Sequence, residues 1–422
     1  MIIVFFFTLA ELLMFSFFSP ITELAQYVFV LLNLTILSIF ILKNHFQYSQ
    51  ILFIGLALRL ILLVIDTNKI FPILHSGADT EVFHAHSLSN SINGNYDLHL
   101  TYYEYFITFI YNIIGSSRIV VQYINVLLGM GILFVLISIF DELSFNIKQK
   151  KHFLCIAAFF PHLIIFSSIL LREAWCEFFI ISSLLYFIRW MKHGGSLFII
   201  QSFICVLVAS VMHSGCIFVG IGYLIAVSFY HPRLSINKIS PSAIFFTIIL
   251  GIVSFYLLAI TEIFTTHFNN FDEEKFNGSG LYVAIEGESA YLTWMNPNSI
   301  SQMLIFAPLK MFYFLFSPLP FNWRGFQDTF AFFFDSCFYF YCMFVFFKNH
   351  KYIKDKIKKN IVIYLMVSFL FLTFSFGYGT ITAGTAMRHR CKIVPIILVI
   401  YAITISEKKK SLKNKVFTIR SS

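Results

Sequence analysis

This sequence of 422 residues contains unusually few charged residues. Only 12% of its residues are charged, whereas soluble globular proteins carry roughly 25%. The sequence also lacks a soluble domain, a glycine-rich phosphate loop, and a metal-ligand spacing or disulfide framework among its seven cysteines. These absences argue against a water-soluble enzyme, a nucleotide site, a metal centre and a bound cofactor.

Apolar residues are abundant instead: they make up 58% of the chain, and Phe alone accounts for 55 residues. Apolar runs of about 17–20 residues recur, which is the length that a helix needs to cross a hydrocarbon layer of ~30 Å. A backbone in lipid must satisfy its own hydrogen bonds, so these runs are expected to be helices. We therefore predict an all-α, polytopic transmembrane helical bundle, one integral membrane domain over residues 1–422. The roughly twelve predicted spans are 2–18, 26–42, 50–65, 118–140, 152–170, 174–191, 197–212, 214–230, 242–262, 329–347, 361–377 and 391–406.

The distribution of Lys and Arg predicts the orientation, because cytoplasmic loops are enriched in both. If the N-terminus is cytoplasmic, 20 of the 30 Lys and Arg residues fall in inner loops or in the basic tail 407–422. Both termini are then inside, and the long loops 66–117 and 263–328 are outside. We expect the apolar stretch 101–115 to be interfacial, and 301–318 to be interfacial or re-entrant.

Several charged side chains fall at the predicted outer ends of the spans, where their cost makes them functional candidates. They are Asp79, Arg172, Glu173, His213, Arg324, Arg388, His389 and Arg390. Structural interpretations also exist: Arg172 and Glu173 as a boundary ion pair, and His213 as a helix-end residue. Arg388 and Arg390 lie on the last predicted outer turn, although Lys and Arg are normally enriched on the cytoplasmic side. This exception favours an anionic ligand there. Because a guanidinium donates two parallel hydrogen bonds to phosphate, we expect a phosphate-bearing lipid head group.

The same residues carry a family resemblance. Residues 161–215, with Leu171-Arg172-Glu173 and Met212-His213-Ser214-Gly215, look like the Wzy-type polymerases of bacterial O-antigen and capsule, including the EpsG-like group. The segments 317–324 and 384–390 extend the resemblance. It implies a GT-C-like membrane glycosyltransferase in the bacterial inner membrane. Its substrates would be undecaprenyl-diphosphate-linked oligosaccharides, joined at the outer face, and a chain-length regulator would be a possible partner.

The resemblance also implies roles for the candidate residues. Arg172, Arg388 and Arg390 would stabilise the leaving lipid diphosphate, since preorganised cations favour developing negative charge. His389 and Arg324 would join them in binding the diphosphate. His213 would orient a phosphate or transfer a proton, and Glu173 and Asp79 are the candidate bases.

Alternatives remain open at this stage. Asp79-Thr80-Glu81 resembles the acidic motif of GT-C transferases that use a polyprenyl-phosphate sugar, but it follows the third predicted span, whereas the family motif follows the first. The same spacing could hold one divalent ion together with a phosphate. An O-antigen ligase is a further enzyme option. A lipid-linked oligosaccharide flippase is the option from another class, and it predicts charges deep inside the helices.

Overall fold

The computed structural model describes residues 2–16, 23–74, 79–94, 101–232, 236–237, 245, 248–249, 289–295, 297, 300–380 and 382–421. The chain forms two compact units. Unit 1 comprises residues 1–137 and 147–178, and unit 2 comprises residues 138–146 and 179–422. Almost every regular element is helical, which confirms the all-α class for the described residues.

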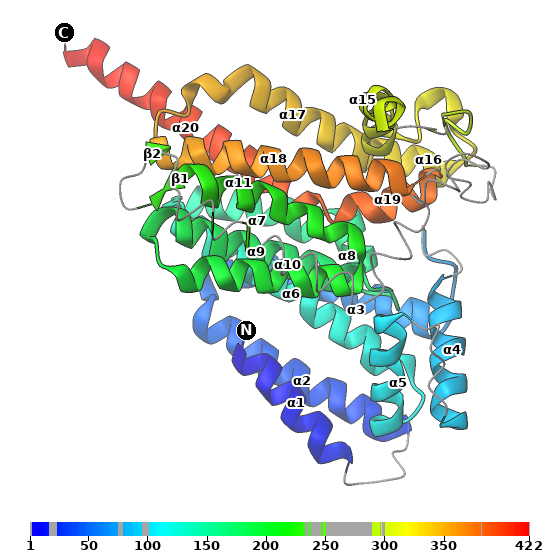
Figure 1. Ribbon diagram of the computed structural model, residues 1–422. Helices are drawn as coiled ribbons and strands as arrows, with labels where there is room; N and C mark the ends of the chain where they lie inside the picture. The colour runs from blue at the N-terminus through cyan, green and yellow to red at the C-terminus, as the bar shows by residue number, and fades with distance from the viewer. Residues whose placement is uncertain are drawn as a thin grey trace. The chain divides into compact units, whose positions relative to one another are not determined.

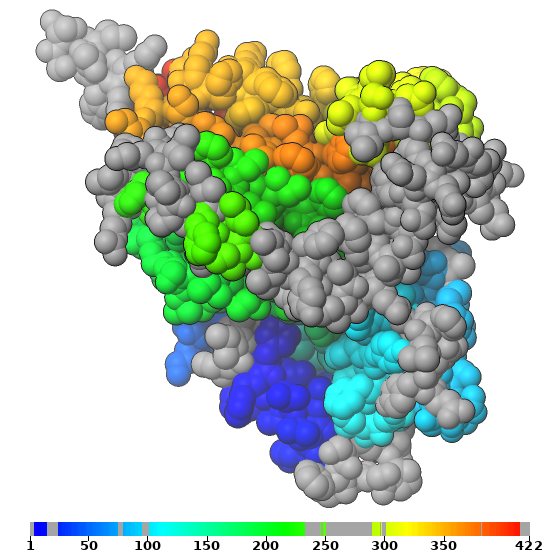
Figure 2. Space-filling model, in the orientation of Figure 1, coloured from blue at the N-terminus to red at the C-terminus, as the bar shows by residue number. Residues whose placement is uncertain are grey.

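Unit 1 is built from the N-terminal helices. They are α1 (Ile2–Ser16), α2 (Glu23–Asn44), α3 (Ser49–Thr67), α4 (Asp79–Asn93), α5 (Tyr102–Ile114), α7 (Ile147–Phe159), α8 (Pro161–Phe166) and the first parts of α6 (Arg118–Glu142) and α9 (Glu173–His193). α4 lies beside α5, and α1 packs against α2 and α5 (Figure 1). In the space-filling view the blue atoms of α1 meet the cyan atoms of α5 on the surface of this unit (Figure 2).

Unit 2 is organised around one long helix, α18 (Lys356–Gly379), which packs against α11, α15, α19 and α20 (Figure 1). The Asp355 side chain caps its start by accepting from the Ile357 and Lys358 N–H groups. The other elements are α10 (Ser196–Met212), α11 (Val219–Phe229), β1 (Tyr230–His231), β2 (Ile236–Asn237), α15 (Ile300–Phe316), α16 (Phe326–Ala331), a π-helical turn (Phe332–Ser336), α17 (Cys337–Asn349), α19 (Ala383–Cys391) and α20 (Val394–Ser421). β1 and β2 pair antiparallel.

Six helices of the described chain are long and apolar enough to cross a membrane. They are Leu24–Asn44, Phe46–Thr67, Arg118–Glu142, Glu173–His193, Phe326–Tyr352 and Lys356–Gly379. Each contains one of the predicted spans, so run length alone located them. The protein is therefore a membrane protein with several transmembrane helices.

The remaining predicted spans have other outcomes. The stretch 152–170 is two short helices, because Pro161 occupies the first turn of α8 and its ring cannot continue α7. Four further apolar helices are shorter than a span: Val4–Met14, Ser196–Met212, Ser214–Phe229 and Ser301–Phe316. The predicted span 242–262 lies mostly outside the described residues. A total of about twelve spans stays a prediction.

The first long loop is more ordered than the sequence suggested. Its residues 79–93 and 102–114 form α4 and α5, and α5 begins with a capping box between Thr101 and Glu104. With 13 residues, α5 extends only about 20 Å and is too short to span; its place at the membrane interface stays a prediction. α15, with Pro308 inside it, covers the stretch predicted to be interfacial or re-entrant. Residues 263–288 of the second long loop lie outside the described residues.

Candidate functional site

In unit 1, a buried amide holds the turn that precedes α9. Asn125 Nδ2 donates to the backbone carbonyls of Ile169 and Leu171, at 2.8 and 2.9 Å, and contacts the Tyr103 hydroxyl at 3.0 Å. Its Oδ1 accepts from the Trp175 indole at 3.0 Å. One side chain of α6 therefore ties the end of the turn to the first turn of α9. A turn fixed in this way can hold the next residue, Arg172, in a constant position.

Arg172 lies at the N-terminus of α9. Its carbonyl accepts from the Trp175 and Cys176 N–H groups, at 3.1 and 3.3 Å, so the helix begins directly after it. The side chain is half-buried, and its Nε is enclosed without a hydrogen-bond partner among the described residues. The positive end of a helix dipole favours an anion at this place. Glu173 and Glu177 follow on the same helix with fully buried side chains.

Asp79, the third candidate of unit 1, is the first residue of α4. Two residues later, Glu81 pairs with Arg118 at 2.7 Å and with Lys69 at 3.1 Å. Arg118 also pairs with Asp66 at 2.9 Å. Partial burial raises the pKa of Glu81, but the hydrogen bonds and charges of Arg118 and Lys69 outweigh it and lower the pKa overall. No group of three potential metal ligands occurs within the described ranges.

In unit 2, two of the predicted histidines lie together. The His213 ring, at the end of α10, is 4.5 Å from the His389 ring of α19, measured between centroids. Both rings pack on Phe376 of α18, at 5.1 and 5.0 Å. The buried Lys392 ammonium lies 2.8 Å from His389 Nδ1 and 5.3 Å from the Phe376 ring centre. An ammonium only donates, so His389 Nδ1 accepts and a neutral His389 carries its proton on Nε2.

Arg390 has a different environment from its neighbours, because successive helical residues point about 100° apart. Its side chain is fully buried; Nη1 donates to the carbonyls of Leu315 and Ser317, at 2.8 and 2.6 Å. Nη2 lies 3.3 Å from the buried carboxylate of Asp335. Leu315 is one of the last residues of α15, whose carbonyls lack helical partners. Arg390 therefore caps α15 and joins it to the π-helical turn before α17. Arg388, beside it on α19, is half-buried.

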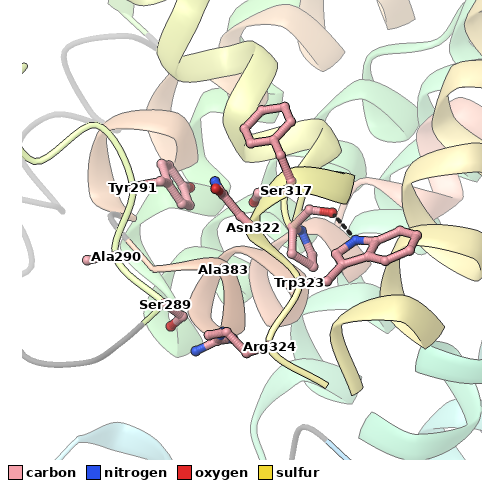
Figure 3. Close-up of a pocket in the computed structure, with 10 residues that line it drawn as sticks. Ser289, Ala290, Tyr291, Ser317, Asn322, Trp323, Arg324 and Ala383 are labelled. Atoms are coloured by element: carbon pink, nitrogen blue, oxygen red, sulfur yellow. Dashed lines mark hydrogen bonds between the residues drawn. The ribbon is translucent and has the colours of Figure 1, made fainter. Parts of the chain in front are cut away.

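Arg324 belongs to a pocket of about 320 Å³ in unit 2 (Figure 3). The residues that line it are Ser289, Ala290, Tyr291, Ser317, Pro318, Phe321, Asn322, Trp323, Arg324 and Ala383. Segment 289–291 is held at the start of α19, where the Ala383 N–H donates to the Ser289 carbonyl at 3.0 Å. The Trp323 indole donates to the Pro318 carbonyl at 3.2 Å. Burial raises the pKa of Tyr291, so its hydroxyl stays protonated at neutral pH.

The Arg324 guanidinium is paired within its own segment. Nε and Nη2 donate to the two carboxylate oxygens of Asp328, each at 2.8 Å, and the Arg324 N–H donates to the same carboxylate at 3.1 Å. Asp328 is almost fully buried, whereas the Arg324 side chain is 41% exposed. The Arg324 guanidinium therefore lies at the pocket, but the Asp328 carboxylate balances its charge, so that the pair adds little net charge.

The candidate residues thus divide between the two units: Asp79, Arg172 and Glu173 in unit 1, and His213, Arg324, Arg388, His389 and Arg390 in unit 2. Their meeting at one membrane interface stays a prediction. Sequence reasoning missed Asn125, Asp335 and Lys392 as organising residues. The available signal for all three was a polar or charged side chain inside a predicted apolar span. Comparisons with protein-family models, curated proteins and solved structures found no match.

Proposed function

We propose that this protein is a polysaccharide polymerase of the bacterial inner membrane, a GT-C-like glycosyltransferase with about twelve spans and both termini in the cytoplasm. It would join undecaprenyl-diphosphate-linked oligosaccharide repeat units at the outer face, for O-antigen or capsule synthesis. The apolar helices support a lipid-anchored substrate. The motifs of residues 161–215, 317–324 and 384–390 support the polymerase class by resemblance.

The observation that carries the proposal is the environment of Arg172. An enclosed guanidinium nitrogen without an acceptor costs free energy, on the order of 1–3 kcal/mol or more for a charged group. A phosphate oxygen would supply that acceptor, and the N-terminus of α9 favours the same negative charge. The Asn125 amide holds the turn in place, so the site is ready before the ligand binds. These features favour a diphosphate over an uncharged ligand at Arg172.

The proposed reaction needs no cofactor. A hydroxyl of the acceptor unit attacks the anomeric carbon of the donor glycan, a new C–O bond forms, and the bond to the lipid diphosphate breaks. The diphosphate leaves with the electron pair, and the hydroxyl proton passes to Glu173, Asp79 or water. Positive groups held in advance lower the barrier because they stabilise the charge that develops on the leaving group.

The proposal separates the roles of the arginines. Arg172 and Arg388 are both half-buried, so each side chain remains partly accessible to a phosphate group. Arg390 would act as a positioning residue, since its guanidinium already serves α15 and Asp335. His389 would present its Nε2 proton, and His213 would orient it through their ring contact.

The test is complementation of a deletion strain. The gene is deleted in its host, and the surface polysaccharide is separated on a gel after complementation with wild type, Arg172→Ala, Arg172→Lys or Arg189→Ala. Arg189 is the matched control because it lies near the other end of the same helix and pairs with Glu142. Immunoblots of membranes establish equal amounts of each variant.

We expect the deletion to leave lipid-linked material with a single repeat unit, and wild type and Arg189→Ala to restore the ladder. Arg172→Ala should fail, and Arg172→Lys should recover only a part, because an ammonium cannot form the two-point contact. A full ladder with Arg172→Ala would refute the role of Arg172. Loss of every repeat unit from the surface after deletion would indicate an earlier step, such as lipid flipping.

A further inference from the structure

The unit 2 pocket differs chemically from the Arg172 turn. Among its ten lining residues Arg324 is the only charged one, and Asp328 neutralises it through two hydrogen bonds of 2.8 Å. A diphosphate carries several negative charges and only accepts hydrogen bonds. A pocket with almost no net charge would not repay the cost of removing such a group from water. The lining therefore argues against a phosphate at this place.

The uncharged lining groups match another kind of ligand. Asn322 offers both an amide donor and a carbonyl acceptor, and Ser289 adds a hydroxyl that can do either. Phe321 and Trp323 contribute aromatic surface, and the Phe321 side chain is exposed to 73%. A sugar ring has this combination: hydroxyls that donate and accept around its edge, and C–H groups that can pack on an aromatic face.

The volume of the pocket limits the size of the ligand that it can hold. A volume of about 320 Å³ is at the lower end of the range for small-molecule sites, roughly 300–1,000 Å³. It suits one sugar ring with a small substituent such as an acetamido group, and it is too small for an oligosaccharide.

The walls of the pocket are also built to stay in place. Arg390 Nη1 donates to the Ser317 carbonyl at 2.6 Å, and the Trp323 indole donates to the Pro318 carbonyl. In Figure 3 Tyr291 and Asn322 lie near each other across the pocket, while Arg324 lies toward Ser289. A preformed polar pocket discriminates between ligands by their hydroxyl pattern more strongly than by their apolar surface.

We propose that this pocket binds one uncharged sugar residue of the lipid-linked repeat unit and thereby selects the substrate. The inference rests on the proposed function for the identity of the complete substrate. The binding of a neutral sugar rests on the pocket alone.

The experiment is saturation-transfer difference NMR on the full-length protein in nanodiscs. The probes are the methyl glycosides of glucose, galactose, N-acetylglucosamine and N-acetylgalactosamine, together with methyl glucuronide and inorganic pyrophosphate as a competitor. The test variant is Phe321→Ala, which removes an exposed side chain and should not impair folding. Phe326→Ala is the matched control, because that side chain is exposed to 72% and does not line the pocket.

We expect at least one neutral glycoside to give a saturation signal that Phe321→Ala abolishes, that Phe326→Ala retains and that pyrophosphate does not displace. Asp328→Asn removes the compensating charge, and it should raise the methyl glucuronide signal relative to the neutral glycosides several-fold. If no neutral glycoside gives a signal that depends on Phe321, or if pyrophosphate displaces it, the inference is overturned.

The outcome is separable from that of the proposed function. Arg172→Ala should retain glycoside binding although it fails to restore the polysaccharide ladder. Glycoside binding without any polymerase phenotype would uphold the sugar site and remove the proposed function. A polymerase phenotype without glycoside binding would uphold the proposed function and overturn the sugar site.

Discussion

Replacing Arg390 by Met tests whether burial, more than distance, determines how much an ion pair contributes to the free energy of unfolding of this protein. Arg390 and Asp335 have side-chain exposures of 0% and 1%, and their closest charged atoms are 3.3 Å apart. Arg390→Met removes the positive charge beside the buried Asp335 carboxylate, and it removes the donor to the Leu315 and Ser317 carbonyls. Breaking a buried pair in this way costs about 3–5 kcal/mol.

The matched comparison is Arg189→Met. Arg189 lies closer to its partner Glu142, at 2.9 Å, but the two side chains are exposed to 33% and 19%. Solvent screens such a pair, so its loss should cost about 0–1 kcal/mol. The Arg189–Glu142 pair, although its distance is shorter, is therefore expected to contribute less to the free energy of unfolding.

The assay is the free energy of unfolding of the purified variants, measured by titration with SDS in mixed micelles. The double variant Arg390→Met/Asp335→Leu should recover part of the lost free energy of unfolding, because it also removes the buried carboxylate charge. Recovery should be incomplete, because the Leu315 and Ser317 carbonyls still lack the Arg390 donor. Equal losses for Arg390→Met and Arg189→Met would show that burial does not set the contribution of these ion pairs, as would a double variant that is less stable than Arg390→Met.

Two further predictions concern packing and pH. A Cβ atom on Gly222 of α11 would lie 2.2 Å from Ser368 Oγ and 2.5 Å from the Tyr364 carbonyl of α18, so Gly222→Ala should lower the unfolding temperature. At Gly379 an added Cβ would meet no atom of the described residues within 4 Å outside its own helix, so Gly379→Ala should leave the unfolding temperature unchanged or slightly higher. Equal effects of the two variants would contradict this account. Burial, and then the nearby charge of Arg118, lower the pKa of His84, which lies 2.8 Å from the Tyr111 hydroxyl. Its stabilising contribution is therefore complete above the unfolded value of about 6.5 and is lost as the pH falls from there through the lowered folded pKa. The protection factors of the amide hydrogens in α4, which correct for the intrinsic exchange rate at each pH, should fall as the pH is lowered from 7.5 to 5.5, and His84→Gln should remove that part of the pH dependence. An unchanged pH profile of the protection factors in the variant would show that His84 is not responsible.

The class of the protein and the position of its longest helices could be predicted from the order of its amino acids alone. The six helices of membrane-spanning length coincide with apolar runs because the length and polarity of a run are local properties of the chain. The break between α7 and α8 was also readable in principle, since it follows from the missing N–H and the ring of Pro161. The polar helix α4 carried a weaker signal, two acidic residues in its first turn.

The contacts of each charged residue, by contrast, could not be predicted without the fold. Arg388, His389 and Arg390 form one basic motif in the sequence, yet His389 faces His213 and Arg390 serves carbonyls that lie 75 and 73 residues away. The sequence predicts Arg324 as a phosphate ligand, and only the structure shows that the carboxylate of Asp328 lies beside its guanidinium. The physical reason is that the charge a buried group presents depends on its neighbours in space. Those neighbours come from distant segments, and helix packing, which the order of residues does not reveal, brings them together.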